Sequence, residues 1–421
     1  MRRTAATVSA ALVVVAASLL LDGCNLFRLK KDVARFDAFG LIGGHVTRVA
    51  DEDAPIIVVL TASPAAGVLD SFVLERPGSY FFVVPPGSYQ IAAFVDRNRD
   101  FTYEPNDEPA AYYGAPTVVP IAAGQKVAGI DVQIPAQPQV RIDFPVAVRD
   151  LGKRGTHELP PVQIGEVVTL DDPRFDAKNG DLGLWQPAEF LFNVGAGFYF
   201  LEPFDSKKIP VLFVHGAGGT PIDWRYVIEH LDRTKFQPWL LYYPSGADLE
   251  VIARGFARWM AAIAARYDFQ HFILVAHSMG GLVSRAAINE MADRDVGGML
   301  SLFVSISSPW NGYGAAASGV EHSPVVMPMW VDMAPGSPFL ASLFKTPLPK
   351  HCPYHLFFSY GGHSLLLGGA NDGTVALSSE LAPPAQQAAT RLYGYDETHM
   401  GILSDAHVSQ TLNALLADAV K

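Results

Sequence analysis

Residues 271–285, HFILVAHSMGGLVSR, carry the pattern that decides the fold of this chain. The apolar run Phe272–Val275 predicts a short buried strand, and the end of the stretch predicts a helix. Between them lies Ser278, with Ala276 two residues before it and Gly280 two residues after it. Small residues at both places indicate a turn so tight that a larger side chain would collide with neighbouring backbone.

A serine on such a strand–turn–helix resembles the nucleophile of the α/β-hydrolases, most closely of their lipase/esterase branch. The usual motif is G-x-S-x-G; this chain has Ala276 at the first small position, as in the A-H-S-M-G-G variant of some bacterial lipases. The resemblance implies that Ser278 is the nucleophile and that the Met279 amide helps to hold an oxyanion. The alternative is a helix-capping serine, which would not need small residues on both sides.

A second motif follows the apolar run 209–214, where the sequence continues His215-Gly216-Ala217-Gly218-Gly219. A strand ending in His-Gly and a glycine-rich loop resembles the oxyanion loop of lipases. By that resemblance the Ala217 amide is the second oxyanion donor, and His215 is structural. The alternative is an ordinary strand–helix turn.

The partners of Ser278 follow from chain order, because this fold places them as serine, acid and then histidine. A serine hydroxyl needs an imidazole as base, and the imidazole needs a carboxylate to orient it. His399 follows the last predicted strand, 390–395, and Asp372 follows the strand 354–360 in Asn-Asp-Gly-Thr-Val. The resemblance therefore implies Ser278, Asp372 and His399 as a triad. The alternatives are His407 for the base and Asp396 or Asp332 for the acid.

Apolar strands alternate with amphipathic helices over residues 206–421, which predicts an α/β fold with a doubly wound, mostly parallel sheet. Residues 313–350 interrupt this order with a segment rich in Met, Pro and Ala. Its position resembles the cap of lipases, and we expect Met327, Met329 and Trp330 to line an acyl pocket. The alternative is a methionine-rich core helix.

Residues 38–148 instead show short β-branched and aromatic runs with turns between them. This predicts an N-terminal β-sandwich, similar to immunoglobulin-like or transthyretin-like modules, joined by a linker with leading strands at 149–205. Asp96, Asn98 and Asp100 have the spacing of the start of a calcium loop, although Phe101 stands where a glycine is usual. The alternative is a solvated acidic loop with Asx turns.

The N-terminus has the form of a targeting segment, with a basic start, a short apolar core and Leu21-Asp22-Gly23-Cys24. This resembles a bacterial lipoprotein signal at 1–23, with lipidation of Cys24 and a charged tether at 24–37. It predicts a protein anchored in the bacterial cell envelope, at the outer membrane if the source is Gram-negative. The alternative is an ordinary secretory signal in which Cys24 is incidental.

The composition limits the kinds of binding partner and cofactor that we expect. The formal net charge is −11, which argues against binding to nucleic acid. Cys24 and Cys352 are the two cysteines, so lipidation of the first leaves no disulfide. The sequence shows no His, Cys and carboxylate spacing typical of a transition-metal site, and we expect no cofactor.

Together these patterns predict a serine hydrolase that cleaves carboxylic esters, with lipid-like acyl chains, through an acyl-enzyme. Amidase, thioesterase and phospholipid deacylase activities remain open, because the same triad serves them all. A non-catalytic surface lipoprotein that binds a partner is the alternative from another class.

Overall fold

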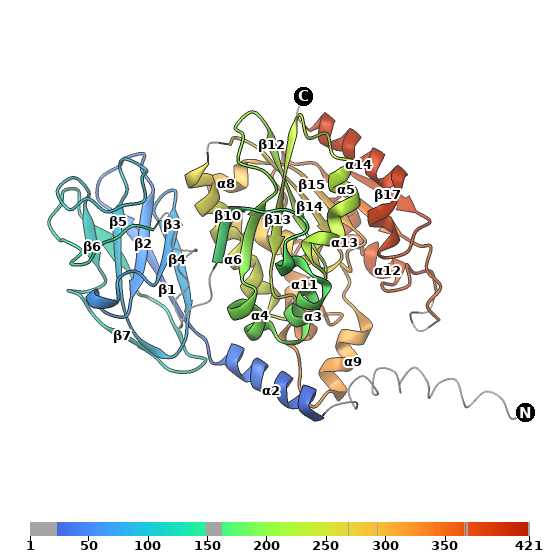
Figure 1. Ribbon diagram of the computed structural model, residues 1–421, viewed down its shortest axis with the longest axis horizontal. Coiled ribbons are helices and arrows are strands. Elements are labelled where there is room, and N and C mark those ends of the chain that lie inside the picture. The colour runs from blue at the N-terminus through green and yellow to red at the C-terminus, as the bar shows by residue number, and fades with distance from the viewer. Residues whose placement is uncertain are drawn as a thin grey trace, which may run out of the picture.

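The computed structural model describes residues 23–148, 162–267, 269–292, 294–365, 367 and 369–419, and side chains from Phe27 onward. The predicted signal peptide, apart from Gly23, lies outside the described residues, as does the side chain of Cys24. Figure 1 shows two units side by side, a smaller β module and a larger α/β unit. A helix, α2 (Gly23–Asp37), runs beneath them.

The larger unit is built on an eight-stranded sheet with the order β10-β11-β13-β12-β14-β15-β16-β17. All its neighbouring strands are parallel except β11 and β13. Parallel strands covered on both faces are expected to be almost continuously apolar, and β12, β14 and β15 are, apart from His277, Ser301 and Ser305. The strands are β10 (Val162–Val167), β11 (Ala196–Phe200), β12 (Ile209–Val214), β13 (Phe236–Tyr242), β14 (Phe272–His277), β15 (Leu300–Ile306), β16 (Tyr354–Ser359) and β17 (Arg391–Tyr395).

Two hydrophobic cores lie on opposite faces of this sheet, because successive side chains of a strand point in opposite directions. In β12, Leu212 and Val214 belong to one core, while Val211 and Phe213 belong to the other. The first core is completed by α6 (Leu249–Arg266) and α7 (Met279–Met291), and the second by α5 (Arg225–Glu229) and α14 (Ala406–Asp418). Strand order, helices on both faces and the sharp turn from β14 into α7 make this the α/β-hydrolase fold that the sequence predicts.

The N-terminal module consists of two sheets that enclose a common core. One has the order β4-β1-β8, with β9 also pairing β1, and the other has the order β3-β2-β5-β6, with β7 pairing β5. Both contribute to one hydrophobic cluster, to which β1 gives Ile42 and Val46 and β2 gives Ile56 and Val58. The strands are β1 (Gly40–Arg48), β2 (Ile56–Thr61), β3 (Asp70–Leu74), β4 (Gly78–Val84), β5 (Gly87–Val95), β6 (Ala110–Tyr112), β7 (Val119–Ile121), β8 (Lys126–Val127) and β9 (Val132–Ile134).

Residues 24–37, expected as a charged tether, instead form most of helix α2, which is docked on the larger unit. Leu29 is buried in the first core, and the Asp32 carboxylate accepts the amides of Ala188 and Glu189, at 3.0 and 2.8 Å. These amides open α4 (Pro187–Asn193), whose first N–H groups have no partner within the helix. The tether interpretation is therefore wrong, because an apolar stripe and a capping carboxylate hold the segment in place.

The join before β12 also differs from the sequence expectation. Leading strands were expected in residues 149–205; the described part of this range contains the strands β10 and β11, but α4 lies between them and extends to Asn193. A second helix, α3 (Ala177–Trp185), precedes α4. Residues 149–161 of the join lie outside the described part of the chain.

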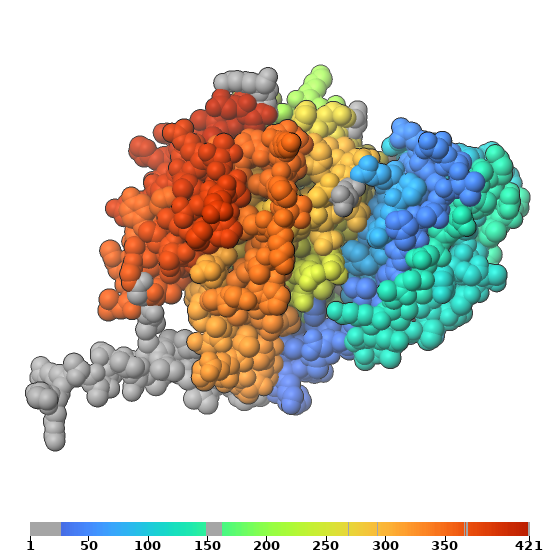
Figure 2. All heavy atoms as spheres, turned by 180° about the vertical axis from the view of Figure 1, so that it is seen from behind, coloured from blue at the N-terminus to red at the C-terminus, as the bar shows by residue number. Residues whose placement is uncertain are grey.

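The segment predicted as a cap contains three short helices, α9 (Gly314–His322), α10 (Pro328–Met333) and α11 (Pro338–Ser342). Figure 2 shows it in orange on the surface, beside the C-terminal segments in red. Met327 is fully buried and Met329 is 5% exposed, both in the first core, whereas Trp330 is partly exposed and meets Trp185 edge to face. The two methionines therefore hold the segment onto the sheet and do not form an open wall.

Among the residues that the structure describes, no helix is both long enough and apolar enough to cross a bilayer.

Candidate active site

Ser278 occupies the turn between β14 and α7 with φ +54° and ψ −130°, a region that side-chain-bearing residues rarely adopt. The turn is held by two backbone hydrogen bonds, from the Ser278 amide to Ile306 O and from the Gly281 amide to Ser278 O. A Cβ added at Gly280 would lie 2.4 Å from His215 O. The residue two after the serine must therefore be glycine, for the steric reason that the sequence indicated.

Three predicted residues meet at this turn. His399 Nε2 lies 2.9 Å from Ser278 Oγ, and His399 Nδ1 lies 2.5 Å from Asp372 Oδ2. All three are buried, at 8%, 7% and 1% exposure for Ser278, His399 and Asp372. The His399 amide also donates to Asp372 O at 2.9 Å, so the two loops that follow β16 and β17 are tied together. The geometry is that of a hydroxyl hydrogen-bonded to an imidazole whose other nitrogen is held by a carboxylate.

Asp372 is ionised although it is buried. Burial alone would raise its pKa, but the hydrogen bond and charge of His399, with the amides of Val375 and Thr374, outweigh burial and lower it. The Ser359 hydroxyl donates to Asp372 Oδ2 at 3.1 Å. A carboxylate that accepts several hydrogen bonds can keep its charge in a site closed to water.

A second buried carboxyl, Glu380, lies behind this site and was not foreseen from the sequence. It is fully buried, and its Oε2 accepts the Ser359 amide at 3.0 Å. Burial, reinforced by the negative charge of Asp372, raises the pKa of Glu380 to about 9. The hydroxyls of Ser307 and Ser359 lie 2.6 Å apart between the strand ends. At neutral pH one carboxyl of the pair, Asp372, is charged and the other, Glu380, is neutral.

His277, next to the serine, was not predicted as a site residue either. Its Nε2 donates to His399 O at 2.9 Å, and the two imidazole rings lie 4.7 Å apart between centroids. Burial is the main cause that lowers the pKa of His277 to about 3, and electrostatic interaction with the nearby His399 is the second cause. A neutral His277 can therefore hold the His399 backbone in place without adding charge.

The glycine-rich loop after β12 lies directly against Ser278. A Cβ added at Gly216 would be 2.8 Å from Ser278 Cβ and 3.3 Å from its Oγ. Two residues just after β13 hold this loop: the Tyr243 hydroxyl donates to His215 O at 2.6 Å, and Ser245 Oγ accepts the Gly218 amide at 2.9 Å. His215 is buried, stacks on Tyr243, and has its pKa lowered to about 4 by burial. Ala217 follows Gly216 and is exposed, and Met279 begins α7.

The alternative partners lie elsewhere. Asp396 and His407 are exposed, and within the described part of the chain neither forms a hydrogen bond or ion pair with Ser278 or His399. Asp332 accepts the Leu249 amide at 2.8 Å and so caps the start of α6. Asp372 and His399 are thus the carboxylate and the imidazole that the fold brings to the serine.

The candidate calcium loop uses its oxygens within the protein. Asp96 accepts the amides of Asp100 and Phe101, and Asp100 accepts the amide of Thr102 and an N–H of Asn98. Within the described residues, no group of three or more His, Cys, Asp or Glu side chains is placed to hold a metal ion. The hydrogen bonds inside the loop are of the Asx-turn type that was the alternative to a calcium loop, although Asp96 itself is buried.

Residues 205–340 match the model of a protein family described as "Putative serine esterase (DUF676)". This span is less than half of the chain; it includes Ser278 and ends before Asp372 and His399. The chain is thus similar to this family over the part that carries the tight turn at Ser278. No curated protein matches the chain.

Several solved structures resemble the chain at low sequence identity. The mature lipase BlEst2 of Bacillus licheniformis is 18% identical, with a TM-score of 0.42, over 53% of this chain and 97% of that one. Lipase B of Aspergillus fumigatus is 16% identical, with a TM-score of 0.40, over 52% of this chain and 55% of that one. The metagenomic carboxyl esterase MGS0156 is 14% identical, with a TM-score of 0.36, over 51% of this chain and 76% of that one.

The neutral state of Glu380 predicts a pH-dependent effect on stability. The folded protein keeps this proton up to about pH 9, whereas the unfolded chain loses it near the ordinary value of 4.5, so this group's contribution to stability falls as pH rises between the two. Glu380→Gln keeps the acceptor for Ser359 and cannot ionise. We expect its melting temperature to rise relative to wild type as the pH goes from 5 to 8.

Thermal unfolding at both pH values measures this effect, with Glu321→Gln as control because Glu321 is exposed on α9. An equal difference between Glu380→Gln and wild type at pH 5 and pH 8 would show that Glu380 is ionised in the folded protein.

Proposed function

We propose that the protein is a serine hydrolase that cleaves carboxylic esters of lipid-like acyl chains. The observation that carries this proposal is the hydrogen-bonded chain from Ser278 through His399 to Asp372, built on a strained turn beneath a glycine-rich loop. A backbone in a sparsely populated region persists only where its surroundings impose it, and such strain is typical of functional sites.

In the proposed reaction Ser278 Oγ attacks the ester carbonyl carbon while His399 Nε2 takes the hydroxyl proton. Asp372 remains ionised, orients the imidazole and stabilises its positive charge. The carbonyl oxygen becomes an oxyanion, which we assign to the amides of Ala217 and Met279. The C–O bond then breaks, and His399 gives the proton to the departing alcohol.

The second half of the reaction releases the acid. Water attacks the acyl group on Ser278, and His399 takes the proton of that water. The second tetrahedral intermediate expels Ser278 Oγ, which regains its proton from His399. Each step uses side chains and amides of this chain, and His277 keeps the His399 backbone in register through its hydrogen bond.

Substitutions at the triad test this mechanism. Ser278→Ala and His399→Ala should each lower kcat by about 10⁴-fold or more, because the residues act as a unit. Asp372→Asn should cost roughly 10³–10⁴-fold. Hydrolysis of a p-nitrophenyl ester measures all three, with Ser404→Ala as control because Ser404 is an exposed serine of the same unit. Wild-type activity in Ser278→Ala would end the proposal, and wild-type activity in Asp372→Asn would move the acid elsewhere.

The preference for an apolar acyl group is supported by exposed apolar side chains in the two loops that carry His399 and Asp372. Met400, the next residue, is 50% exposed, and Leu365, in the loop before Asp372, is 98% exposed. Met400, which follows the His399 base of the proposed mechanism, can contact an acyl chain, and burying apolar surface in this way is favourable.

A panel of p-nitrophenyl esters with increasing chain length tests this preference, since each buried methylene contributes about 0.8 kcal/mol. We expect kcat/KM to rise with chain length, and Met400→Ser to flatten the rise while sparing acetyl esters. Matched thioesters and amides in the same panel separate esterase from thioesterase and amidase activity. An equal loss of kcat/KM for short-chain and long-chain esters in Met400→Ser would contradict a contact between Met400 and the acyl chain.

We further propose that lipidated Cys24 anchors the protein in a bacterial envelope. The support is the sequence Leu21-Asp22-Gly23-Cys24 after a short apolar core. Cells fed labelled palmitate should label the wild type and the Cys352→Ala control, but not Cys24→Ser, which should leave the membrane fraction or stay uncleaved. A mature protein that begins at any residue other than Cys24 would contradict the anchor.

A further inference from the structure

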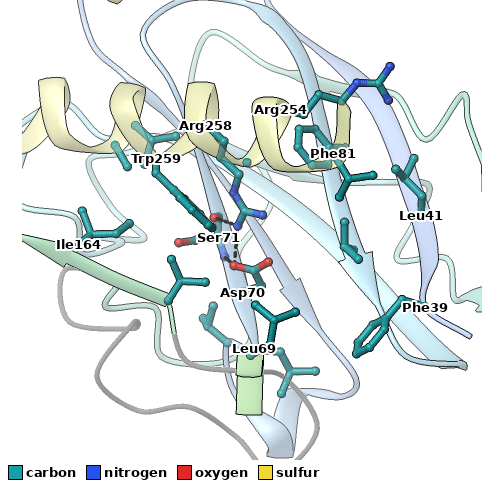
Figure 3. A pocket seen from close by; sticks show the side chains of 18 of the residues that line it. Phe39, Leu41, Leu69, Asp70, Ser71, Phe81, Ile164, Arg254, Arg258 and Trp259 are labelled. Carbon is teal, nitrogen blue, oxygen red and sulfur yellow. Dashed lines mark hydrogen bonds and ion pairs between the residues drawn. The ribbon is translucent and has the colours of Figure 1, made fainter. Parts of the chain in front are cut away.

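A cavity of about 820 Å³ lies between the β module and the larger unit, and its lining does not include Ser278, Asp372 or His399. Figure 3 shows its two walls, the strands of the module on one side and α6 on the other. Leu41, Leu69 and Phe81 line it from the module, and Ile164, Val251 and Trp259 line it from the larger unit. Its volume falls in the range of about 300–1,000 Å³ that is usual for small-molecule sites.

The module wall is apolar where a sheet would normally present polar residues to solvent. In β4, Tyr80, Phe82 and Val84 are buried in the module core, so the alternate residues Phe81 and Val83 point outward into the cavity. Both remain only partly buried, as do Leu41, Val251 and Trp259 around the same space. Within the described residues, the two units thus leave apolar surface facing a void, which is unfavourable unless an apolar occupant covers it.

Most charged groups of the cavity already have partners. Arg258 binds Asp70 Oδ1 at 2.5 Å and also the carbonyl of Ser71, as Figure 3 shows. Arg254 pairs with Glu250 and Glu290. Asp248 accepts the Val251 amide, and Arg266 donates to Val148 O. Because these charged groups already have partners, they are not expected to attract a charged ligand.

Lys126 is the exception. It lies directly opposite Leu41 in the pairing of β8 with β1, and Leu41 lies opposite Val83 in the pairing of β1 with β4. Residues paired in this way share one face of a sheet, so Val83, Leu41 and Lys126 form a row from an apolar interior to a cationic rim. Lys126 is exposed, and no carboxylate of the described residues forms an ion pair with it.

We propose that this cavity binds a long-chain amphiphile with an anionic end. The aliphatic chain lies between the outward face of β4 and β1 and the Val251–Trp259 side of α6, and the carboxylate or phosphate lies at Lys126. Affinity should rise roughly fourfold for each added methylene until the cavity is full. A cationic head of the same chain length would meet Lys126 with like charge and bind less tightly.

The cavity touches one loop that also reaches the candidate active site. Tyr243 and Ala247 line it, and between them Ser245 holds the Gly218 amide of the glycine-rich loop. A long-chain ligand could also enter the acyl site at Ser278. The test therefore measures binding in a Ser278→Ala background and locates it with substitutions in the cavity.

The experiment titrates the full chain with cis-parinaric acid, a fluorescent long-chain carboxylate, and follows its displacement by non-fluorescent amphiphiles. The protein carries Cys24→Ser so that no lipid or detergent competes, and Ser278→Ala so that no ester is turned over. Dodecanoate should displace the probe at least about tenfold better than octanoate or dodecyltrimethylammonium. Dodecyl phosphate distinguishes a phosphate head from a carboxylate head, and preference for either fits the proposal.

Two substitutions place the ligand. Val83→Trp fills the cavity, and Lys126→Glu reverses the rim charge; each should weaken parinaric acid binding about tenfold or more. The controls are Ser79→Trp and Lys207→Glu, which should bind parinaric acid as the parent protein does. Ser79 is exposed in the same strand as Val83 but does not line the cavity, and Lys207 is an exposed lysine of the larger unit. Circular dichroism checks that each variant folds, and if Val83→Trp does not, Lys126→Glu decides because Lys126 is exposed.

Absence of saturable binding would overturn the proposal. So would equal displacement by dodecanoate and dodecyltrimethylammonium, or unchanged binding in both Val83→Trp and Lys126→Glu.

Discussion

The close approach of three backbone segments at Ser278 is the constraint on which the site depends. The start of α7 passes so near to the end of β12 that Gly280 has no room for a Cβ beside His215 O, and Gly216 has none beside Ser278. This crowding holds Ser278 at positive φ and places its Oγ within reach of His399. Strands β16 and β17 follow β14 and β15 in the sheet order, and the loops after them carry Asp372 and His399.

The charge next to His399 depends on Asp372 and Glu380 having different protonation states. Asp372 is surrounded by donors, namely two amides, the Ser359 hydroxyl and His399, and keeps its charge. Glu380 is equally buried, has fewer donors and keeps its proton. Two ionised carboxylates so close together would repel each other in a poorly solvated space. The neutral Glu380 therefore leaves a single negative charge to act on His399.

How much could be predicted from the sequence depended on whether the signal was local. The tight turn at Ser278, the glycine-rich loop after β12 and the order of the serine, acid and histidine loops are local patterns. They predicted the fold and the three residues, Ser278, Asp372 and His399, that the structure brings together. Glu380, Ser307 and His277 were missed because their roles arise from contacts between strand ends far apart in the chain. The tether was misjudged for the same reason: Asp32 caps a helix 156 residues away, and the charges of α2 concealed the stripe of Leu29, Val33 and Phe36.

The most direct test of the account is the location of a covalent adduct. The protein is labelled with a fluorophosphonate, digested, and the modified residue is identified by mass spectrometry, with His399→Ala labelled in parallel. The account predicts a single adduct on Ser278 in the wild type and little labelling in His399→Ala, because the imidazole makes the hydroxyl nucleophilic. An adduct on another residue, or equal labelling of the two proteins, would contradict it.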